Sequence, residues 1–343
     1  MTDRPAKTDQ PKKSHRSWIA LGAVVLVAGL YFGVTSFLFR RAPGDANAPP
    51  IVVVIERGWG LSHIAGELQR TGVVASRAGF LLLAKETGVG GRIQAGEYAF
   101  ARGQTLAAVL DQLAHHRTLK HKFTVAPGVT AAQVAAKLAA AGLDPHGAAT
   151  KLIADPAFAA SLGVSAPTLE GYLYPETYVY ERGDEAQAML VRMVKQFFQV
   201  WNQRFAARAK SNGLTPPQIV TLASIIEKES GFPPERPRIA RVFLNRLALG
   251  MRLQADPTVI YAAGERWRNK LTEADLRREN AYNTYAHAGL PPGPICSPGA
   301  DAIEAVLAPA AGPWQYFVAN GEGRHVFSVT LDEHHRAVQQ FQR

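Results

Sequence analysis

Hydrophobic positions divide the chain into three regions with different periodicities. The stretch from Trp18 to Phe39 holds 22 residues without a charge, which is long enough to cross a lipid bilayer as a helix. Between residues 51 and 125, short strand-like runs frame stretches with helical spacing, and from about residue 186 helical spacing dominates. Two alternating runs around Asn320 and Gly321 predict a β-hairpin. The pattern predicts an α+β chain: a single N-terminal transmembrane helix, a small α/β module, then a mainly helical domain with a C-terminal β-hairpin.

The same pattern suggests where these regions begin and end. Residues 42–50 are rich in Pro, Ala, Gly and Asn, which is typical of a linker. We therefore expect a cytoplasmic tail at 1–17, the transmembrane helix at 18–39, a linker at 40–50, the small module at 51–125, a connecting helical region at 126–165 and the large domain at 166–343. Within that large domain, one amphipathic helix is expected over 186–209 and further helices over 216–229 and 238–249.

Positive charge is concentrated on both sides of the apolar stretch. Residues 1–41 carry seven Lys or Arg against two Asp, or +5 of the net +10, and the remaining +5 is too dilute over about three hundred residues to indicate nucleic-acid binding. A basic tail favours an N-terminus in the cytoplasm and a body beyond the membrane. A cleaved signal peptide is the alternative, because Ala46-Asn47-Ala48 resembles a cleavage site. The anchor is preferred, since the apolar stretch exceeds an ordinary signal core and Arg40-Arg41 separates it from that site.

Cysteine and histidine usage argues against several classes of site. Cys296 is alone, so neither an internal disulfide nor a cysteine-based zinc site is expected. The ten histidines show no His-Glu-x-x-His spacing, and His334-His335 on the last helix are expected to face solvent. No metal and no cofactor is predicted.

One helix carries an acid where its pattern calls for an apolar residue. Ile219, Leu222, Ile226 and Glu229 fall at i, i+3, i+7 and i+10, so Glu229 continues a buried stripe. Glu227 lies about 100° from the middle of that stripe and is expected to lean toward water.

The end of this helix adds to the case for Glu229. Gly231 is expected to act as the C-cap and Pro233 cannot continue the helix, so Glu229 should meet the negative end of the helix dipole. Partial burial and the dipole would both raise the pKa of Glu229, as a general acid requires. Glu229→Gln should therefore abolish catalysis, and Glu227→Gln should cost much less.

Three further segments carry more polar and aromatic groups than a core needs. Residues 170–178 combine tyrosines with two acids, which suits a sugar site but also an aromatic-rich strand. Residues 250–258 form a polar loop in which Asp256 could simply cap a helix. Residues 282–285, Tyr-Asn-Thr-Tyr, precede a stiff proline-rich loop at 289–295.

These segments, in this order, resemble the membrane-anchored endolytic murein transglycosylases of the YceG-like (MltG) family, which cut nascent peptidoglycan. The resemblance is strongest at 170–178, 222–230, 245–261, 282–299 and the hairpin ending at 325–327. It implies that the second glutamate of Glu-Lys-Glu, Glu229, is the catalytic acid. The resemblance and the composition of the segments give these substrate-binding candidates: Glu170, Tyr172, Gln254, Asp256, Asn283 and Tyr285.

The resemblance also implies a reaction and a location. The family cuts the bond between N-acetylmuramic acid and N-acetylglucosamine without water and leaves a 1,6-anhydro end. The chain is then a single-pass protein of the bacterial inner membrane, with its catalytic domain in the periplasm beside penicillin-binding glycan polymerases. Residues 51–125 resemble a LysM-like glycan-binding module, although a generic spacer is the plainer interpretation. A hydrolytic muramidase and a non-catalytic peptidoglycan-binding protein are the alternatives.

Overall fold

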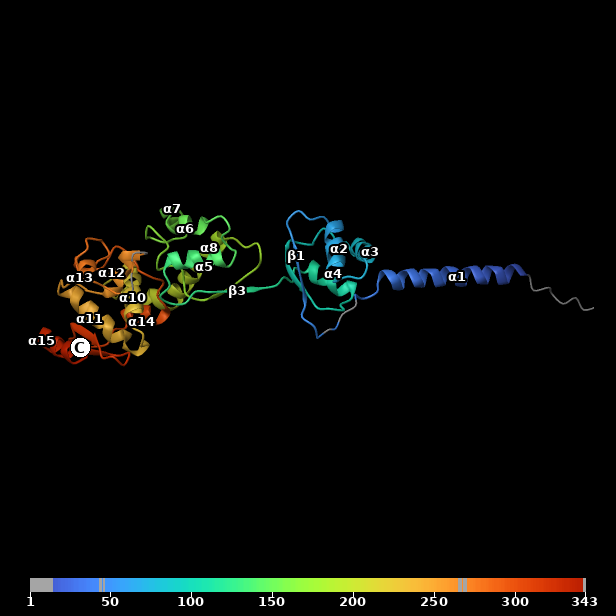
Figure 1. Ribbon diagram of the computed structural model, residues 1–343. Helices are drawn as coiled ribbons and strands as arrows, with labels where there is room; N and C mark the ends of the chain where they lie inside the picture. Colours follow the sequence, from blue (N-terminus) through green and yellow to red (C-terminus); the bar gives the residue numbers. More distant parts are fainter. Residues whose placement is uncertain (1–14, 43–44, 46, 265–266, 268–269, 342–343) are drawn as a thin grey trace, which may run out of the picture. The chain divides into compact units, whose positions relative to one another are not determined.

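The computed structural model describes residues 15–42, 45, 47–264, 267 and 270–341, and its contacts divide the chain into two units (Figure 1). The first unit runs through His121 and the second begins at Lys122. Of the predicted cytoplasmic tail, residues 1–14 lie outside the described residues. Because the two units are separate bodies, each is described by itself.

The first unit begins with the apolar helix α1 (His15–Leu38). Within it, the span Leu21–Leu38 has a mean hydropathy of 2.1, and none of it is buried in the protein. An exposed apolar surface of this length is costly in water and favourable in lipid. The helix is therefore compatible with a single-pass membrane anchor, although a signal sequence has the same composition.

The rest of the first unit pairs two strands around a helical core. Strands β1 (Ile51–Ile55) and β2 (Gly96–Phe100) are antiparallel, with Ile51 opposite Phe100. The chain between and after them forms α2 (Leu61–Arg70), α3 (Arg77–Glu86) and α4 (Leu106–Ala114). The predicted order of strand, two helices and strand is confirmed, and Phe80, Tyr98 and Phe100 are fully buried among the helices. The LysM-like identity of the unit stays a prediction.

The second unit opens with a two-stranded sheet and a group of short helices. Strands β3 (His121–Thr124) and β4 (Thr177–Tyr180) pair with each other, and three helices lie between them in the sequence. Those helices are α5 (Ala131–Ala140), α6 (Ala148–Ile153) and α7 (Pro156–Ser161). Their buried residues, within the predicted connecting region 126–165, share one hydrophobic core with the rest of the unit.

A long helix follows this group and is interrupted once. The predicted helix over 186–209 consists of α8 (Ala186–Val200), a π-helical turn (Trp201–Phe205) and α9 (Ala206–Ala209). Its aromatic face packs inward as expected, with Phe197 stacked on Trp201 at a ring separation of 5.9 Å. These aromatic side chains therefore serve the core.

Helix α10 (Pro216–Glu229) occupies the centre of the second unit. It packs against three other helices, and Figure 1 shows them gathered around it: α11 (Arg236–Ala248), α12 (Asp256–Ala263) and α14 (Ala300–Leu307). A single 3₁₀ turn, Pro233–Glu235, connects α10 to α11, and the short α13 (Glu273–Leu276) follows α12. Every residue from Ile219 to Ile226 is buried, so α10 has almost no water-facing side.

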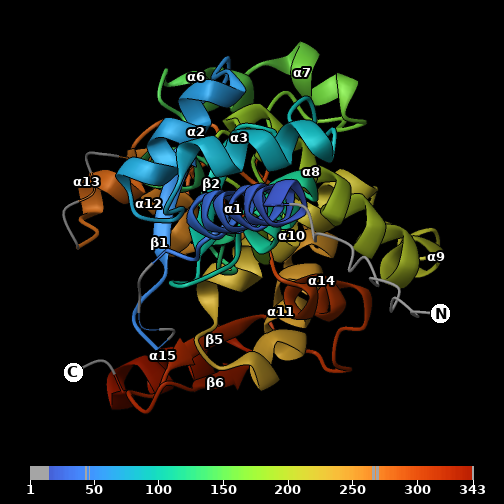
Figure 2. The ribbon, with the colours of Figure 1, turned by 90° about the vertical axis from the view of Figure 1, so that its right-hand side faces the viewer.

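The C-terminal β-hairpin is confirmed. Strands β5 (Tyr316–Ala319) and β6 (His325–Ser328) are antiparallel, and α15 (Leu331–Phe341) packs against both, as Figure 2 shows. Phe317 of β5 packs edge-on against Phe243 of α11 at a ring separation of 5.7 Å. The hairpin and α15 are thereby fixed beside the end of α10 that carries Glu229.

Candidate active site

The ends of α10 are set by local chemistry. Thr215 and Gln218 form a capping box at the start, where Pro216 fits because its missing N–H is not needed in the first turn. At the other end, Ser230 leaves the helix in an extended conformation (φ −110°, ψ 111°) and its Oγ bonds to the backbone of Phe232. The helix ends after Glu229 as predicted, but its C-cap is Ser230, not Gly231 as expected, and the φ of Gly231 is not positive.

Glu227 is buried, which corrects the prediction that it leans toward water. Its side chain is 5% exposed, and its carboxylate accepts hydrogen bonds from Arg236 Nη2 at 2.7 Å and from the backbone N–H of Gly299 at 2.9 Å. Arg236 is itself only 11% exposed. Glu227 thus ties α10 to the starts of α11 and α14 and has no free face for substrate.

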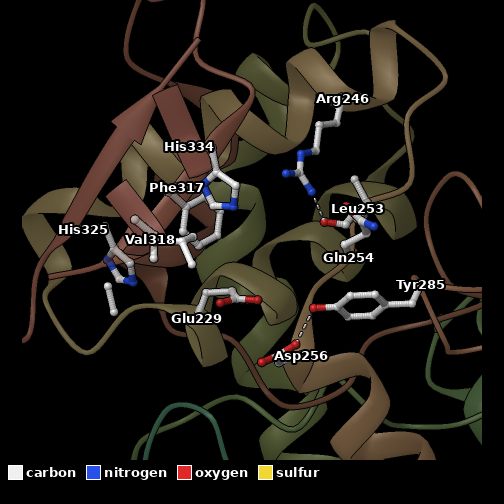
Figure 3. A pocket seen from close by; sticks show the side chains of 12 residues that line it. Glu229, Arg246, Leu253, Gln254, Asp256, Tyr285, Phe317, Val318, His325 and His334 are labelled. Atoms are coloured by element: carbon white, nitrogen blue, oxygen red, sulfur yellow. Dashed lines mark hydrogen bonds between the residues drawn. The ribbon is translucent and has the colours of Figure 1, made fainter. Parts of the chain in front are cut away.

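A pocket of about 420 Å³ opens at the end of α10. Glu229 lines it together with Asp256 and Tyr285, and Figure 3 shows Arg246 and His334 across the pocket from Glu229 and Asp256. The C-terminal hairpin closes another side with Phe317, Val318 and His325. A pocket of this size is typical of small-molecule and oligosaccharide sites.

The Glu229 carboxyl has the properties of an acid held in its protonated form. Burial raises its pKa to about 8, the negative charge of Asp256 adds to this, and the positive charge of Arg246 opposes it. The sequence predicts that burial raises the pKa of Glu229. It gives no sign that the carboxylate of Asp256 lies close enough to raise that pKa further. At neutral pH the group is protonated and faces the pocket, as general acid catalysis requires.

Asp256 is held beside Tyr285 by contacts between two loops. The Tyr285 hydroxyl donates to Asp256 Oδ1 at 2.6 Å. Thr284 joins the loops, because its Oγ1 accepts from the backbone N–H of Ala255 at 2.9 Å and its carbonyl accepts from that of Gln254 at 3.1 Å. Asp256 begins α12 without capping it by a side-chain hydrogen bond. Its carboxylate is therefore available to the pocket.

Gln254 lies at this junction in an unusual backbone conformation. Its φ is +51°, a left-handed value that residues other than Gly adopt at a cost of about 1–3 kcal/mol. The side chain is exposed and lines the pocket. Three predicted binding residues, Gln254, Asp256 and Tyr285, are thus brought together with Glu229.

Glu170 is not among the residues that line this pocket. It is 5% exposed and accepts hydrogen bonds from the backbone N–H of Ala131, at the start of α5, and from the Tyr261 hydroxyl at 3.2 Å. Burial raises its pKa to about 7, against these hydrogen bonds. In the structure the Glu170 carboxylate is bonded to the start of α5 and to Tyr261. It is therefore not a free carboxylate that lines a groove.

Tyr172 and Asn283 also lie away from the pocket lining. Tyr172 is 4% exposed and packs edge-on against Phe197 at 4.9 Å. Asn283 is 1% exposed, and its side-chain amide donates to the carbonyls of Leu276 and Arg278. Both side chains are used by the fold, and Asn283 shapes the loop that presents Tyr285.

The pocket also contains residues that were not named as a site from the sequence. Arg246 and His325 fall inside segments with strong family resemblance, which is the signal that could have found them. The prediction that His334 faces solvent is wrong, because it is half-buried and lines the pocket, whereas its neighbour His335 is exposed. Within the described residues, no three or more His, Cys, Asp or Glu side chains gather in a way that could hold a metal ion.

Relatives from two bacteria match most of the chain. An endolytic murein transglycosylase of Bacillus subtilis is 31% identical over 325 residues, which cover 89% of this chain and 90% of the relative. An endolytic murein transglycosylase of Streptococcus pneumoniae strain D39 is 29% identical over 346 residues, which cover 92% of this chain and 62% of the relative. This chain therefore spans nearly the whole Bacillus protein and about three-fifths of the streptococcal one.

A solved structure and a family model agree with these matches. A 2.6 Å crystal structure of a YceG-like protein from Listeria monocytogenes is similar, with a TM-score of 0.58 and 32% identity over 84% of this chain and 99% of the other. The model of the YceG-like family matches residues 53–340, which include most of β1, all of β2 and all of the pocket. The chain belongs to the YceG-like family.

Proposed function

We propose that the chain is an endolytic murein transglycosylase that cuts the bond between N-acetylmuramic acid and N-acetylglucosamine. The observation that carries the proposal is Glu229, an acid with a pKa raised to about 8 in a 420 Å³ pocket. The names of the Bacillus and Streptococcus relatives supply the substrate class. Peptidoglycan strands are accordingly the proposed partner.

Glu229 performs both proton transfers in this proposal. It first donates its proton to the glycosidic oxygen as the bond to C1 breaks. The resulting carboxylate then removes the proton from the C6 hydroxyl of the same sugar, and O6 bonds to C1 to give a 1,6-anhydro end. The proton returns to Glu229, so the step consumes no water and leaves the enzyme unchanged. Asp256 and Tyr285 border the acid, while Gln254 contacts the sugar from the loop.

Product analysis tests this function. Purified glycan strands treated with the full-length chain are expected to yield anhydro ends, each lighter by one water than a reducing end. A hydrolytic muramidase is the second candidate, because Asp256 shares the pocket and could activate water. Reducing ends would establish hydrolysis, and glycan binding without new ends would establish a non-catalytic binding protein.

Asp256 should control the pH range of cleavage. Glu229 acts as an acid only while protonated, so kcat/KM is expected to fall as pH rises through about 8. The charge of Asp256 helps to raise that pKa, and Asp256→Asn should therefore move the alkaline fall to lower pH. The matched control is Asp301→Asn, which removes an exposed carboxylate of α14 outside the pocket. An unchanged alkaline limb in Asp256→Asn would contradict the assignment.

We also propose a location and further binding partners for the protein. We place the apolar stretch 18–39 in the inner membrane, with residues 1–17 in the cytoplasm and the catalytic domain, 166–343, in the periplasm. Retention of the full-length chain in membranes after alkaline washing checks the anchor, since a cleaved and released chain would wash off. A penicillin-binding polymerase as partner and glycan binding by residues 51–125 stay predictions that rest on resemblance alone.

A further inference from the structure

One wall of the pocket carries nitrogen groups that the fold does not use fully. Arg246 is 7% exposed; its Nε donates to the carbonyl of Gln315 and its Nη1 to that of Leu253, each at 2.6 Å. No described residue accepts from Nη2, and the guanidinium remains a cation at neutral pH. Nε and Nη1 of Arg246 thus bond to the backbone, and Nη2 is left to donate into the pocket.

His334 lies on the same wall and is also incompletely bonded. Its Nδ1 is buried without a hydrogen-bond partner among the described residues. Burial lowers the pKa of His334, and the charge of Arg246 lowers it further, so the ring is neutral at pH 7. A neutral imidazole offers one donor and one acceptor nitrogen.

Both groups are held by one aromatic ring. The His334 ring stacks on Tyr316 at 5.3 Å with an interplanar angle of 22°, and the Arg246 guanidinium lies 5.2 Å from the centre of the same ring. Leaving a buried polar atom unpaired costs about 1–3 kcal/mol. A substrate group that satisfies this atom, once a small turn of the ring opens it to the pocket, recovers that cost on binding.

We propose that Arg246 and His334 bind a secondary amide group of the glycan, an inference that rests on the proposed function. Arg246 donates to the amide carbonyl, and the acceptor nitrogen of His334 takes the amide N–H. A secondary amide carries an acceptor oxygen and a donor N–H, so one group can satisfy the Arg246 cation and the imidazole acceptor together. Because the wall faces Glu229 across the pocket, an amide held there orients the sugar for protonation (Figure 3).

Two sources in peptidoglycan share this chemistry. The acetamido group of each sugar is a secondary amide, and so is the link between the lactyl group and the stem peptide. Three glycans separate them: an N-acetylated peptide-free strand, the same strand after removal of its acetyl groups, and a peptide-bearing strand. The second of these contains no amide.

The test measures affinity by calorimetry in full-length Glu229→Gln, so that cleavage does not interfere. Adding His334→Phe keeps an aromatic ring on Tyr316 but removes both ring nitrogens. It is expected to weaken glycan binding about three- to tenfold, which corresponds to the loss of one neutral hydrogen bond. His334→Asn keeps a polar atom near Nδ1 and should recover part of the loss. The control His335→Ala changes the exposed neighbour and should bind like the Glu229→Gln parent.

The pattern over the three glycans decides the outcome. A loss on the N-acetylated strand that vanishes after deacetylation supports the inference and assigns the acetamido group; a loss confined to peptide-bearing strands supports it and assigns the lactyl amide. Equal affinities in His334→Phe and its parent, or an equal loss on the strand without amides, would overturn it. A Glu229→Gln parent that binds no glycan overturns both proposals. Normal binding by that parent, together with no anhydro products from the unsubstituted chain, overturns the proposed function alone.

Discussion

Glu229→Gln is expected to lower the rate of glycan cleavage by roughly two to four orders of magnitude while the protein stays folded. The amide keeps the shape of the carboxyl but cannot give up and recover a proton. Glu229 makes no hydrogen bond to a described residue that the substitution would break, so binding of the glycan should survive. The measurement is the rate of formation of new chain ends on purified strands. Undiminished cleavage would remove Glu229 from the mechanism.

Thermal unfolding provides an independent check of the same variant. Folding raises the pKa of Glu229 from its ordinary 4.5 to about 8, so the folded state holds a proton that the unfolded state releases between these values. The parent therefore loses stability as pH rises from about 4.5 to 8, whereas the amide of the variant cannot ionise. The melting temperature of Glu229→Gln relative to the parent is expected to increase from about pH 5 to about pH 8. A difference that is constant over this range would contradict the raised pKa.

Glu227→Ala is expected to lower the free energy of unfolding by about 3–5 kcal/mol. The substitution leaves Arg236, which is 11% exposed, as a buried charge without its carboxylate and also frees the N–H of Gly299. The midpoint of denaturant unfolding measures the effect. Lys228→Ala is the matched control, because this side chain is exposed and should change the free energy by less than about 0.5 kcal/mol.

A double variant shows whether the loss of stability in Glu227→Ala comes from the broken ion pair. Replacing Glu227 by Leu and Arg236 by Met together removes both charges, and apolar pairs of similar volume often match a buried ion pair in stability. The double variant should therefore unfold at higher denaturant than Glu227→Ala. Glu227→Gln, which keeps an acceptor for Arg236, is still expected to retain most of its cleavage rate per folded molecule. Unfolding of Glu227→Ala at the parent's midpoint would contradict the structural role.

Local patterns predicted the elements around the site well. The period of Ile219, Leu222 and Ile226 and the proline at 216 defined α10, and Asn320-Gly321 defined the hairpin. The placement of Glu227 failed for a physical reason. Helical periodicity assumes one buried face, but α10 is enclosed by three helices, so a polar residue on its far side meets Arg236 instead of water.

The composition of a segment could not separate substrate-binding groups from groups that the fold uses. Glu170 and Asn283 carry the acid and the amide that a sugar site needs, yet their hydrogen bonds go to the backbone of α5 and of the 276–278 turn. Arg246 and His334 reach the pocket from helices almost ninety positions apart in sequence. That meeting depends on long-range packing, for which a local pattern contains no signal.

The pocket is finished by the part of the chain that is synthesised late. Helix α10 is made about a hundred residues before α15, whose His334 and Val338 supply one wall. Until α15 has folded onto the hairpin, water reaches Glu229 from that side and the acid is expected to ionise as an ordinary carboxyl does. A chain that has not yet folded α15 is therefore expected to lack both the complete pocket and the raised pKa of Glu229.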